Sequence, residues 1–181
     1  IFIRFSGCNL WTGLEKDRTR ATCYWCDTDF VGTDGINGGR YTSTEIKNII
    51  LNLWPKNQKS KPYVVCTGGE PLLQMDDDLI FNIHDAGFEI GIETNGTVIP
   101  PKNIDWVCVS PKAKTDIVIT KGNELKIVYP QCGINPRMYE DLDFEHFFIQ
   151  PMDGKDQKEA IKESEKSVSY THLTLPTRLP V

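Results

Sequence analysis

The stretch CNLWTGLEKDRTRATCYWCDT, residues 8–28, places three cysteines, Cys8, Cys23 and Cys26, directly after the apolar run of residues 1–5. Their spacing is C-x14-C-x2-C. Two cysteines separated by two residues can direct both sulfurs at one metal centre, and a third can join them after a closed loop. Three thiolates suit a four-iron cluster that leaves one iron open to a further ligand. The spacing therefore favours an iron–sulfur site.

Zinc, a disulfide and buried thiols are the alternatives for these cysteines. A structural zinc site needs four ligands, and the sequence lacks the usual second C-x2-C or H-x3-H pair. His84 or His146 would have to complete the set, and neither has a ligand-like neighbour. Six cysteines among 181 residues are far fewer than a disulfide-stapled secreted domain carries. The remaining cysteines, Cys66, Cys108 and Cys132, lie in or beside apolar runs, and we expect them in the core.

Length and composition indicate one globular domain with a sizeable core. The formal net charge of −5 argues against bulk binding to nucleic acid or to a membrane surface. No apolar run is long enough to cross a bilayer and no signal peptide is visible, so reduced cysteines predict a cytoplasmic location. Because the sequence begins at Ile1 inside a strand-like run, we expect the native N-terminus to be missing.

Apolar runs alternate with helical patterns along the chain. The first helix is predicted from a capping box at residues 42–45 and ends before Pro55. Two further helices are predicted at residues 76–86 and 155–166. The six predicted strands are residues 1–5, 62–66, 88–93, 105–109, 124–129 and 147–149.

This order predicts an α/β fold with a mostly parallel sheet, because parallel strands need crossover connections. Five of the six strands run into a polar or glycine-rich cluster at their carboxyl ends. Such ends open onto one face of barrel and open α/β folds, where sites assemble. We therefore expect these clusters to converge: Cys8 and residues 67–70, 93–95, 110–112 and 150–153.

Together these residues resemble the radical S-adenosylmethionine (SAM) enzymes, and most closely the 7-carboxy-7-deazaguanine synthase family of the queuosine pathway. The C-x14-C-x2-C spacing is characteristic of one branch of that family, whereas most radical SAM enzymes use C-x3-C-x2-C. TGGEP at residues 67–71, SPK at 110–112 and QPMD at 150–153 match in order and at fitting intervals. The resemblance implies a partial (β/α)6 barrel of TIM type, with one radical SAM core domain over residues 1–167.

The resemblance also implies a set of cofactor ligands. Cys8, Cys23 and Cys26 would hold a [4Fe-4S] cluster whose open iron binds the amino and carboxylate groups of SAM. Gly69 would let the backbone approach the methionine moiety, and Glu70 would accept from the SAM amino group. The remaining SAM contacts would come from Ser110, Pro111, Lys112, Gln150, Pro151, Met152 and Asp153.

Substrate and metal contacts follow from the same resemblance. Arg4 would bind a substrate carboxylate, Thr67 would bind the pterin, and Thr28 would coordinate Mg²⁺. The implied enzyme is a carbon–nitrogen lyase that contracts the ring of 6-carboxy-5,6,7,8-tetrahydropterin to 7-carboxy-7-deazaguanine with loss of ammonia. A flavodoxin- or ferredoxin-type donor would supply the electron, and the family implies a homodimer without direct nucleic-acid or membrane contacts.

Each of these residues has a simpler interpretation when it is taken alone. Arg4 fits a surface charge at a strand end, and Thr28 fits a turn cap. Glu93 and Lys112 fit a solvated pair, with Lys126 at a strand edge. Only the joint pattern favours the functional assignment.

Both ends of the sequence depart from the family. Its N-terminal strand and Gln-Gly-Glu-Gly substrate loop are absent. Residues 169–181, SYTHLTLPTRLPV, carry no acidic residue and no helical period. We expect residues 168–181 to be a non-native tail that packs poorly, and extensive burial of Leu173 and Leu175 would contradict this.

Two other functions remain open. A radical SAM activase, which makes a glycyl radical on a partner protein, would carry C-x3-C-x2-C and would lack the matches at residues 26–28 and 150–151. A non-catalytic Fe–S or zinc module would bind metal but would have no use for Gly69, Ser110 and Gln150.

Overall fold

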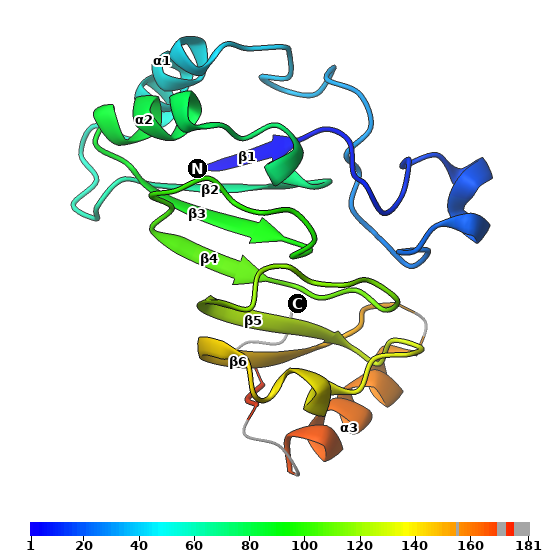
Figure 1. Cartoon of the computed structure of the whole chain (residues 1–181). Coiled ribbons are helices and arrows are strands. Elements are labelled where there is room, and N and C mark those ends of the chain that lie inside the picture. The colour runs from blue at the N-terminus through cyan, green and yellow to red at the C-terminus, as the bar shows by residue number, and fades with distance from the viewer. Residues whose placement is uncertain (155, 170–172, 176–181) are drawn as a thin grey trace.

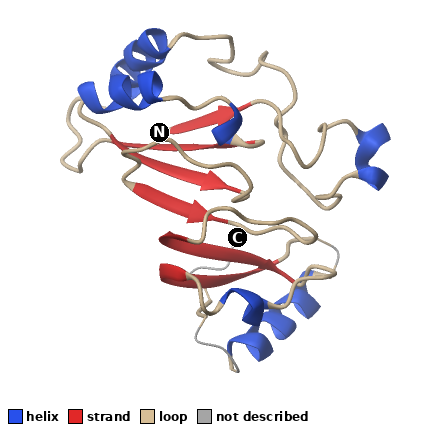
Figure 2. Ribbon diagram, in the orientation of Figure 1, coloured by secondary structure: helices blue, strands red, loops and turns tan. Residues whose placement is uncertain are grey.

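The computed structural model describes residues 1–154, 156–169 and 173–175. Over these residues it forms a six-stranded sheet in which every strand pairs in parallel with its neighbour in the chain (Figures 1 and 2). This confirms the predicted parallel α/β sheet. The strands are β1 (Phe2–Phe5), β2 (Tyr63–Gly68), β3 (Glu89–Thr94), β4 (Trp106–Val109), β5 (Lys121–Tyr129) and β6 (Asp143–Pro151).

The helices begin where the sequence supplies caps. The Thr42 hydroxyl accepts from the Glu45 amide and the Glu45 carboxylate accepts from the Thr42 amide, so the predicted capping box is present. Asp76 caps the next helix through the Leu79 amide. Lys155, the predicted start of the last helix, lies outside the described residues. The helices are α1 (Ser43–Leu53), α2 (Asp77–Asp85) and α3 (Gln157–Val168), with short 3-10 turns η1 (Glu15–Arg20), η2 (Pro71–Leu73) and η3 (Pro136–Tyr139).

Three crossovers differ from the predicted (β/α)6 pattern, and one of them, from β5 to β6, contains only the 3-10 turn η3. Within the described residues, loops rather than helices connect β3 to β4 and β4 to β5. Gly96, Pro100 and Pro101 lie in the first of these loops and disfavour a helix there. The result is an open sheet of the partial-barrel type, with α1 and α2 over one end and α3 over the other (Figure 1).

The core lies between the sheet and its helices. Ile90 and Ile92 of β3 are almost fully buried and pack with Ile83 of α2 in one apolar cluster. Side chains alternate along each strand, so Glu93 and its neighbours in register fall on the opposite face. That second face carries polar and charged groups beside the carboxyl ends of the strands.

The C-terminal segment packs better than predicted. Leu173 is only 2% exposed, and Leu175 packs against the core cluster. The Thr174 amide donates to Phe147 O at 2.9 Å, and the Ile149 amide donates to Thr174 O at 2.8 Å, which extends the sheet at the β6 edge. The prediction of poor packing is therefore wrong for residues 173–175. The rest of the suspected tail, residues 170–172 and 176–181, lies outside the described residues.

Across the residues that the structure describes, none of the helices is both long and apolar enough to cross a bilayer.

Candidate functional site

Cys8 is held beside the glycine pair that follows β2. The Gly69 amide donates to Phe5 O at 3.0 Å, and the Glu70 amide donates to Gly7 O at 2.9 Å. A Cβ on Gly69 would lie 1.9 Å from Gly7 O and 3.1 Å from the Cys8 nitrogen. Glycine at 69 thus has a reason in the fold itself, since two backbone segments cross there without room for a side chain.

Cys23 and Cys26 form a tight turn opposite Cys8. The Cys26 amide donates to Cys23 O at 3.2 Å. Behind the larger effect of burial, the charge of Cys26 helps to raise the pKa of Cys8. All three cysteines are free thiols, with Cys23 buried and the other two half-buried.

The arrangement of these thiols bears on what they can bind. Among the described residues, no three His, Cys, Asp or Glu side chains are gathered closely enough to hold a single ion. A four-iron cluster spreads its cysteine ligands over different irons, so it needs sulfurs that face one space rather than one point. The soft thiolate donors suit such a cluster, and the cluster itself stays a prediction.

The two thiols of the turn titrate very differently. The hydrogen bond from Cys23 lowers the pKa of Cys26 to about 6, and the same bond raises the pKa of Cys23. Burial raises the pKa of Cys8, although the Leu10 amide donates to its sulfur at 3.4 Å. Cys26 is therefore the thiol most readily present as a thiolate, the form that binds iron.

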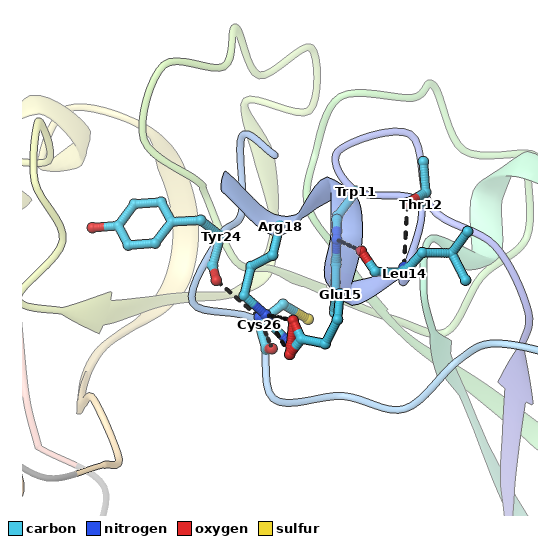
Figure 3. Close-up of polar contacts among 7 residues, drawn as sticks. All are labelled: Trp11, Thr12, Leu14, Glu15, Arg18, Tyr24 and Cys26. Carbon is cyan, nitrogen blue, oxygen red and sulfur yellow. Dashed lines mark hydrogen bonds and ion pairs between the residues drawn. The ribbon is translucent and has the colours of Figure 1, made fainter. Parts of the chain in front are cut away.

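The long segment between Cys8 and Cys23 closes on itself. The Thr22 amide donates to Leu10 O at 3.1 Å, so residues 11–21 leave and return at one point. The Gly7 amide likewise donates to Phe30 O at 3.3 Å. Within this loop, η1 places the Arg18 guanidinium against the backbone of the Cys23–Cys26 turn (Figure 3).

Glu70 is a fully buried carboxylate at the centre of the strand ends. Its Oε1 accepts from the Leu72 amide at 3.1 Å and from Thr94 Oγ1 at 2.7 Å, and its Oε2 accepts from the Asn95 amide at 2.8 Å. Burial raises the pKa of Glu70, while these three hydrogen bonds oppose that rise. In the chain alone the carboxylate joins the ends of β2 and β3, and its predicted contact with SAM stays a prediction.

A polar chain links the Cys8 loop to the end of β3. Asn95 Nδ2 donates to Asn9 Oδ1 at 2.9 Å, and Asn9 Nδ2 donates to Thr97 Oγ1 at 2.7 Å. The predicted convergence of these two clusters is thus confirmed. The sequence analysis assigned no role to Asn9 or Thr97, because neither belongs to a motif.

Lys112 lies on the cysteine side of the site. Its Nζ donates to the carbonyl and hydroxyl oxygens of Ser110, both at 2.7 Å, and stands 5.6 Å from the centre of the Trp25 ring. Burial lowers the pKa of Lys112, while the nearby thiols oppose that shift. The alternative interpretation of Lys112 as the partner of Glu93 does not hold, since its Nζ bonds Ser110.

Glu93 pairs with Lys126 on the polar face of the sheet. Lys126 Nζ donates to Glu93 Oε1 at 2.9 Å, and Thr67 Oγ1 donates to Oε2 at 2.9 Å. Burial opposes ionisation of Glu93, but Lys126 beside it lowers its pKa overall, and the charge of the exposed Arg4 acts in the same sense. Lys126 lies on β5, between β4 and β6, so the alternative interpretation of Lys126 as a strand-edge residue does not hold.

The QPMD segment lies farther along the sheet. Gln150 and Pro151 end β6, while Met152 and Asp153 line a cavity of about 230 Å³ against α3. Asp153 Oδ1 accepts from Gln157 Nε2 at 3.0 Å. In the described part of the chain, no hydrogen bond or ion pair joins this segment to the cysteines, so its predicted SAM contacts stay predictions.

Thr28, the predicted magnesium ligand, lies beside the cysteine turn. It is half-buried next to Cys26, and its hydroxyl donates weakly to Asp27 Oδ1 at 3.4 Å.

The three cysteines outside the motif differ in burial. Cys66 and Cys108 are buried as predicted, whereas Cys132 is exposed, so its expected place in the core is wrong.

The sequence is similar to curated proteins along most of its length. No family model matches it. It is 55% identical over 160 residues to the 7-carboxy-7-deazaguanine synthase of Bradyrhizobium diazoefficiens, covering 88% of this chain and 76% of that protein. It is 54% identical to the synthase of that name from Burkholderia multivorans and 52% identical to the one from Bordetella pertussis, each over 85% of this chain and 73% of the relative.

A solved structure has a similar fold. The crystal structure of QueE from Escherichia coli superposes with a TM-score of 0.66 over 96% of this chain and 82% of that one. Sequence identity across this alignment is 22%, so the match speaks for the fold alone.

Proposed function

Because the chain belongs to the 7-carboxy-7-deazaguanine synthase family, we propose that it converts 6-carboxy-5,6,7,8-tetrahydropterin to 7-carboxy-7-deazaguanine in queuosine biosynthesis. The proposed enzyme is a radical SAM carbon–nitrogen lyase that releases ammonia. The names of the relatives support an enzyme of this family, and the residues at the strand ends support the radical chemistry.

One observation carries the proposal. Backbone hydrogen bonds from Gly69 and Glu70 hold the segment from Phe5 to Gly7, and with it Cys8, at the carboxyl end of β2. Burial and, more weakly, the charge of Cys26 raise the pKa of Cys8 there. The three cysteines thus supply soft donors near the end of the sheet that carries the GGE segment, residues 68–70. A SAM-binding cluster requires this shared location. A buried structural thiol set would have no need of this shared location.

The cluster and SAM carry the hard chemistry, and the chain orients it. When bound, a [4Fe-4S] cluster cleaves SAM reductively and thereby allows a hydrogen atom to be taken from the pterin. Lys112 places a positive charge within reach of the turn thiolates and of Glu70, which offsets their negative charge. Glu70 keeps the ends of β2 and β3 together, so that Gly69 stays beside Cys8.

Substrate binding is proposed on the polar face of the sheet. The Thr67 hydroxyl already donates its proton to Glu93, so we propose that Thr67 accepts a hydrogen bond from the pterin. Arg4 and Lys126 place two positive charges around the single carboxylate of Glu93. The excess positive charge suits the carboxylate of the substrate, which Arg4 can hold bidentately.

Magnesium is part of the same proposal. Thr28 follows the cysteine turn, and its hydroxyl donates weakly to Asp27 Oδ1 at 3.4 Å, so its oxygen lone pairs are available to a hard cation. Substrate oxygens and water would complete the coordination shell.

Anaerobic reconstitution tests the proposal. The chain should take up about four irons and cleave SAM when it is reduced. A chain extended by the family's N-terminal strand and substrate loop should form 7-carboxy-7-deazaguanine from the carboxypterin. Cys8→Ala, Cys23→Ala and Cys26→Ala should each abolish cluster binding. Cys132→Ala is the matched control, because this exposed thiol lies outside the group and should leave iron content unchanged.

The alternatives predict other results in the same assay. Binding of one zinc without SAM cleavage would refute the proposal and establish a metal-binding module. SAM cleavage without deazaguanine, together with a glycyl radical on a partner protein, would establish an activase. A flavodoxin- or ferredoxin-type donor, a homodimer and a cytoplasmic location belong to the proposal, and donor titration and sedimentation test the first two.

A further inference from the structure

The loop between Cys8 and Cys23 contains a side chain, Arg18, that hydrogen-bonds to the backbone of the turn between Cys23 and Cys26. Arg18 Nη1 donates to Tyr24 O at 2.8 Å and to Cys26 O at 2.9 Å (Figure 3). The Tyr24 carbonyl lies within the turn that carries both cysteines, and the Cys26 carbonyl lies at its end. One planar group thus fixes the turn at two points.

Arg18 is itself held on two further sides. Its Nε donates to Glu15 Oε1 at 2.9 Å, one turn earlier in η1. Its guanidinium carbon lies 4.1 Å from the centre of the Trp11 ring, a cation–π distance. The guanidinium therefore reaches the turn from a fixed position.

Trp11 provides a rigid base for this contact. The ring is 7% exposed, its Nε1 donates to Leu14 O at 3.3 Å, and Phe30 packs edge-on against it at 5.6 Å. A mobile surface arginine would lose much of its contact energy to side-chain entropy. Arg18, packed on a buried ring, avoids much of that loss.

We propose that Arg18 is a positioning residue, supplied by the long C-x14-C loop, that holds the Cys23–Cys26 turn in the conformation that binds the cluster. The identity of the cluster rests on the proposed function, but the contact between Arg18 and the turn does not. Arg18 touches neither substrate nor cluster in this role; it acts through the backbone of Tyr24 and of one ligand residue, Cys26.

The proposal separates geometry from charge. Lysine at position 18 keeps the positive charge but lacks the planar guanidinium, which stacks on Trp11 and bonds Glu15 through Nε while its Nη1 reaches both carbonyls. Glutamine loses both the charge and the guanidinium. Arg20→Gln is the matched control, since Arg20 lies exposed on the same turn and, in the described part of the chain, makes no side-chain hydrogen bond or ion pair.

Hydrogen exchange on metal-free protein tests directly whether Arg18 stabilises the turn. The Cys26 amide, bonded to Cys23 O at 3.2 Å, reports opening of the turn. Loss of hydrogen bonds to a charged donor should raise its exchange at least about tenfold in both Arg18→Lys and Arg18→Gln. Arg20→Gln should match wild type, as should sheet amides in every variant. Wild-type exchange in Arg18→Lys would overturn the proposal.

The reconstituted protein tests whether the contact between Arg18 and the turn affects the cluster. Arg18→Gln should lower the midpoint potential of the bound cluster, because a lost positive charge disfavours the more negative reduced state. Both Arg18 variants should broaden the electron paramagnetic resonance signal of the reduced cluster. An unchanged signal and potential in a folded variant with a loosened turn would overturn the positioning role. A wild-type chain that binds no iron refutes the proposed function, while the exchange result still decides whether Arg18 holds the turn.

Discussion

Replacing Gly69 by alanine tests whether the GGE segment holds Cys8 in place. The new Cβ would lie 1.9 Å from Gly7 O, whereas ordinary contact begins at 3.4 Å. The two backbone segments would therefore have to separate by about 1.5 Å. Neither atom belongs to the flexible end of a side chain, so no rotation relieves the clash.

The expected cost follows from what that separation breaks. Two hydrogen bonds span the crossing, Gly69 N to Phe5 O at 3.0 Å and Glu70 N to Gly7 O at 2.9 Å. Each contributes about 1 kcal/mol net, and overpacking adds about 1–3 kcal/mol. We expect Gly69→Ala to lower the free energy of unfolding by about 3–5 kcal/mol and to displace Cys8.

Urea unfolding of the metal-free chain measures this cost, and iron content after reconstitution measures the displacement. Gly35→Ala is the matched control, because a Cβ there meets nothing within 4 Å. It should be neutral or slightly stabilising, since alanine restricts the unfolded chain. The reasoning fails if Gly69→Ala unfolds within about 0.5 kcal/mol of Gly35→Ala.

Three further predictions concern the fold around the site. Thr42→Ala removes the capping box of α1 and should cost about 1 kcal/mol in urea unfolding, whereas an unchanged midpoint would show that the cap is not needed. Leu173→Ala should cost about 2–4 kcal/mol if the C-terminal segment packs as described, and no loss would restore the original expectation of poor packing. Burial opposes ionisation of Asp105, but hydrogen bonds from His84 and the Ile90 amide lower its pKa below 3.8. That stabilisation is present above pH 3.8 and is lost as pH falls through the lowered pKa, so Asp105→Asn should flatten the acid limb of stability against pH.

The strands were predictable because burial leaves a strong pattern in the sequence. Each predicted apolar run became a strand, and parallel pairing followed from the crossovers between them. The N-terminal ends of β5 and β6 were missed. Lys121 and Asp143 begin these strands and pair in register, but polar residues leave no apolar signal in the sequence. The sequence shows no helical period after β3 or β4, in agreement with the loops found there, whereas the (β/α)6 pattern implied by the resemblance would place helices at both points.

The site was predictable only where residues carry chemistry in their side chains. The convergence of Cys8 with the GGE segment follows from the shared direction of parallel strands. Arg18 could not be found in this way, because its partners are backbone carbonyls, which every residue has. The Glu93–Lys126 pair joins β3 to β5 across β4, and it becomes visible only once the register of three strands is known.

The structure also explains how a cluster motif can tolerate so long a spacing. The bond from the Thr22 amide to Leu10 O closes the loop just inside the two cysteines, so residues 11–21 do not set the distance between Cys8 and Cys23. A closed loop adds little entropic cost as it lengthens, since that cost grows only with the logarithm of its length. The added residues are then available for another use, and here they place Trp11 and Arg18 against the turn that carries Cys26. The spacing of the motif is thus set by what the loop holds, not by what the three sulfurs need.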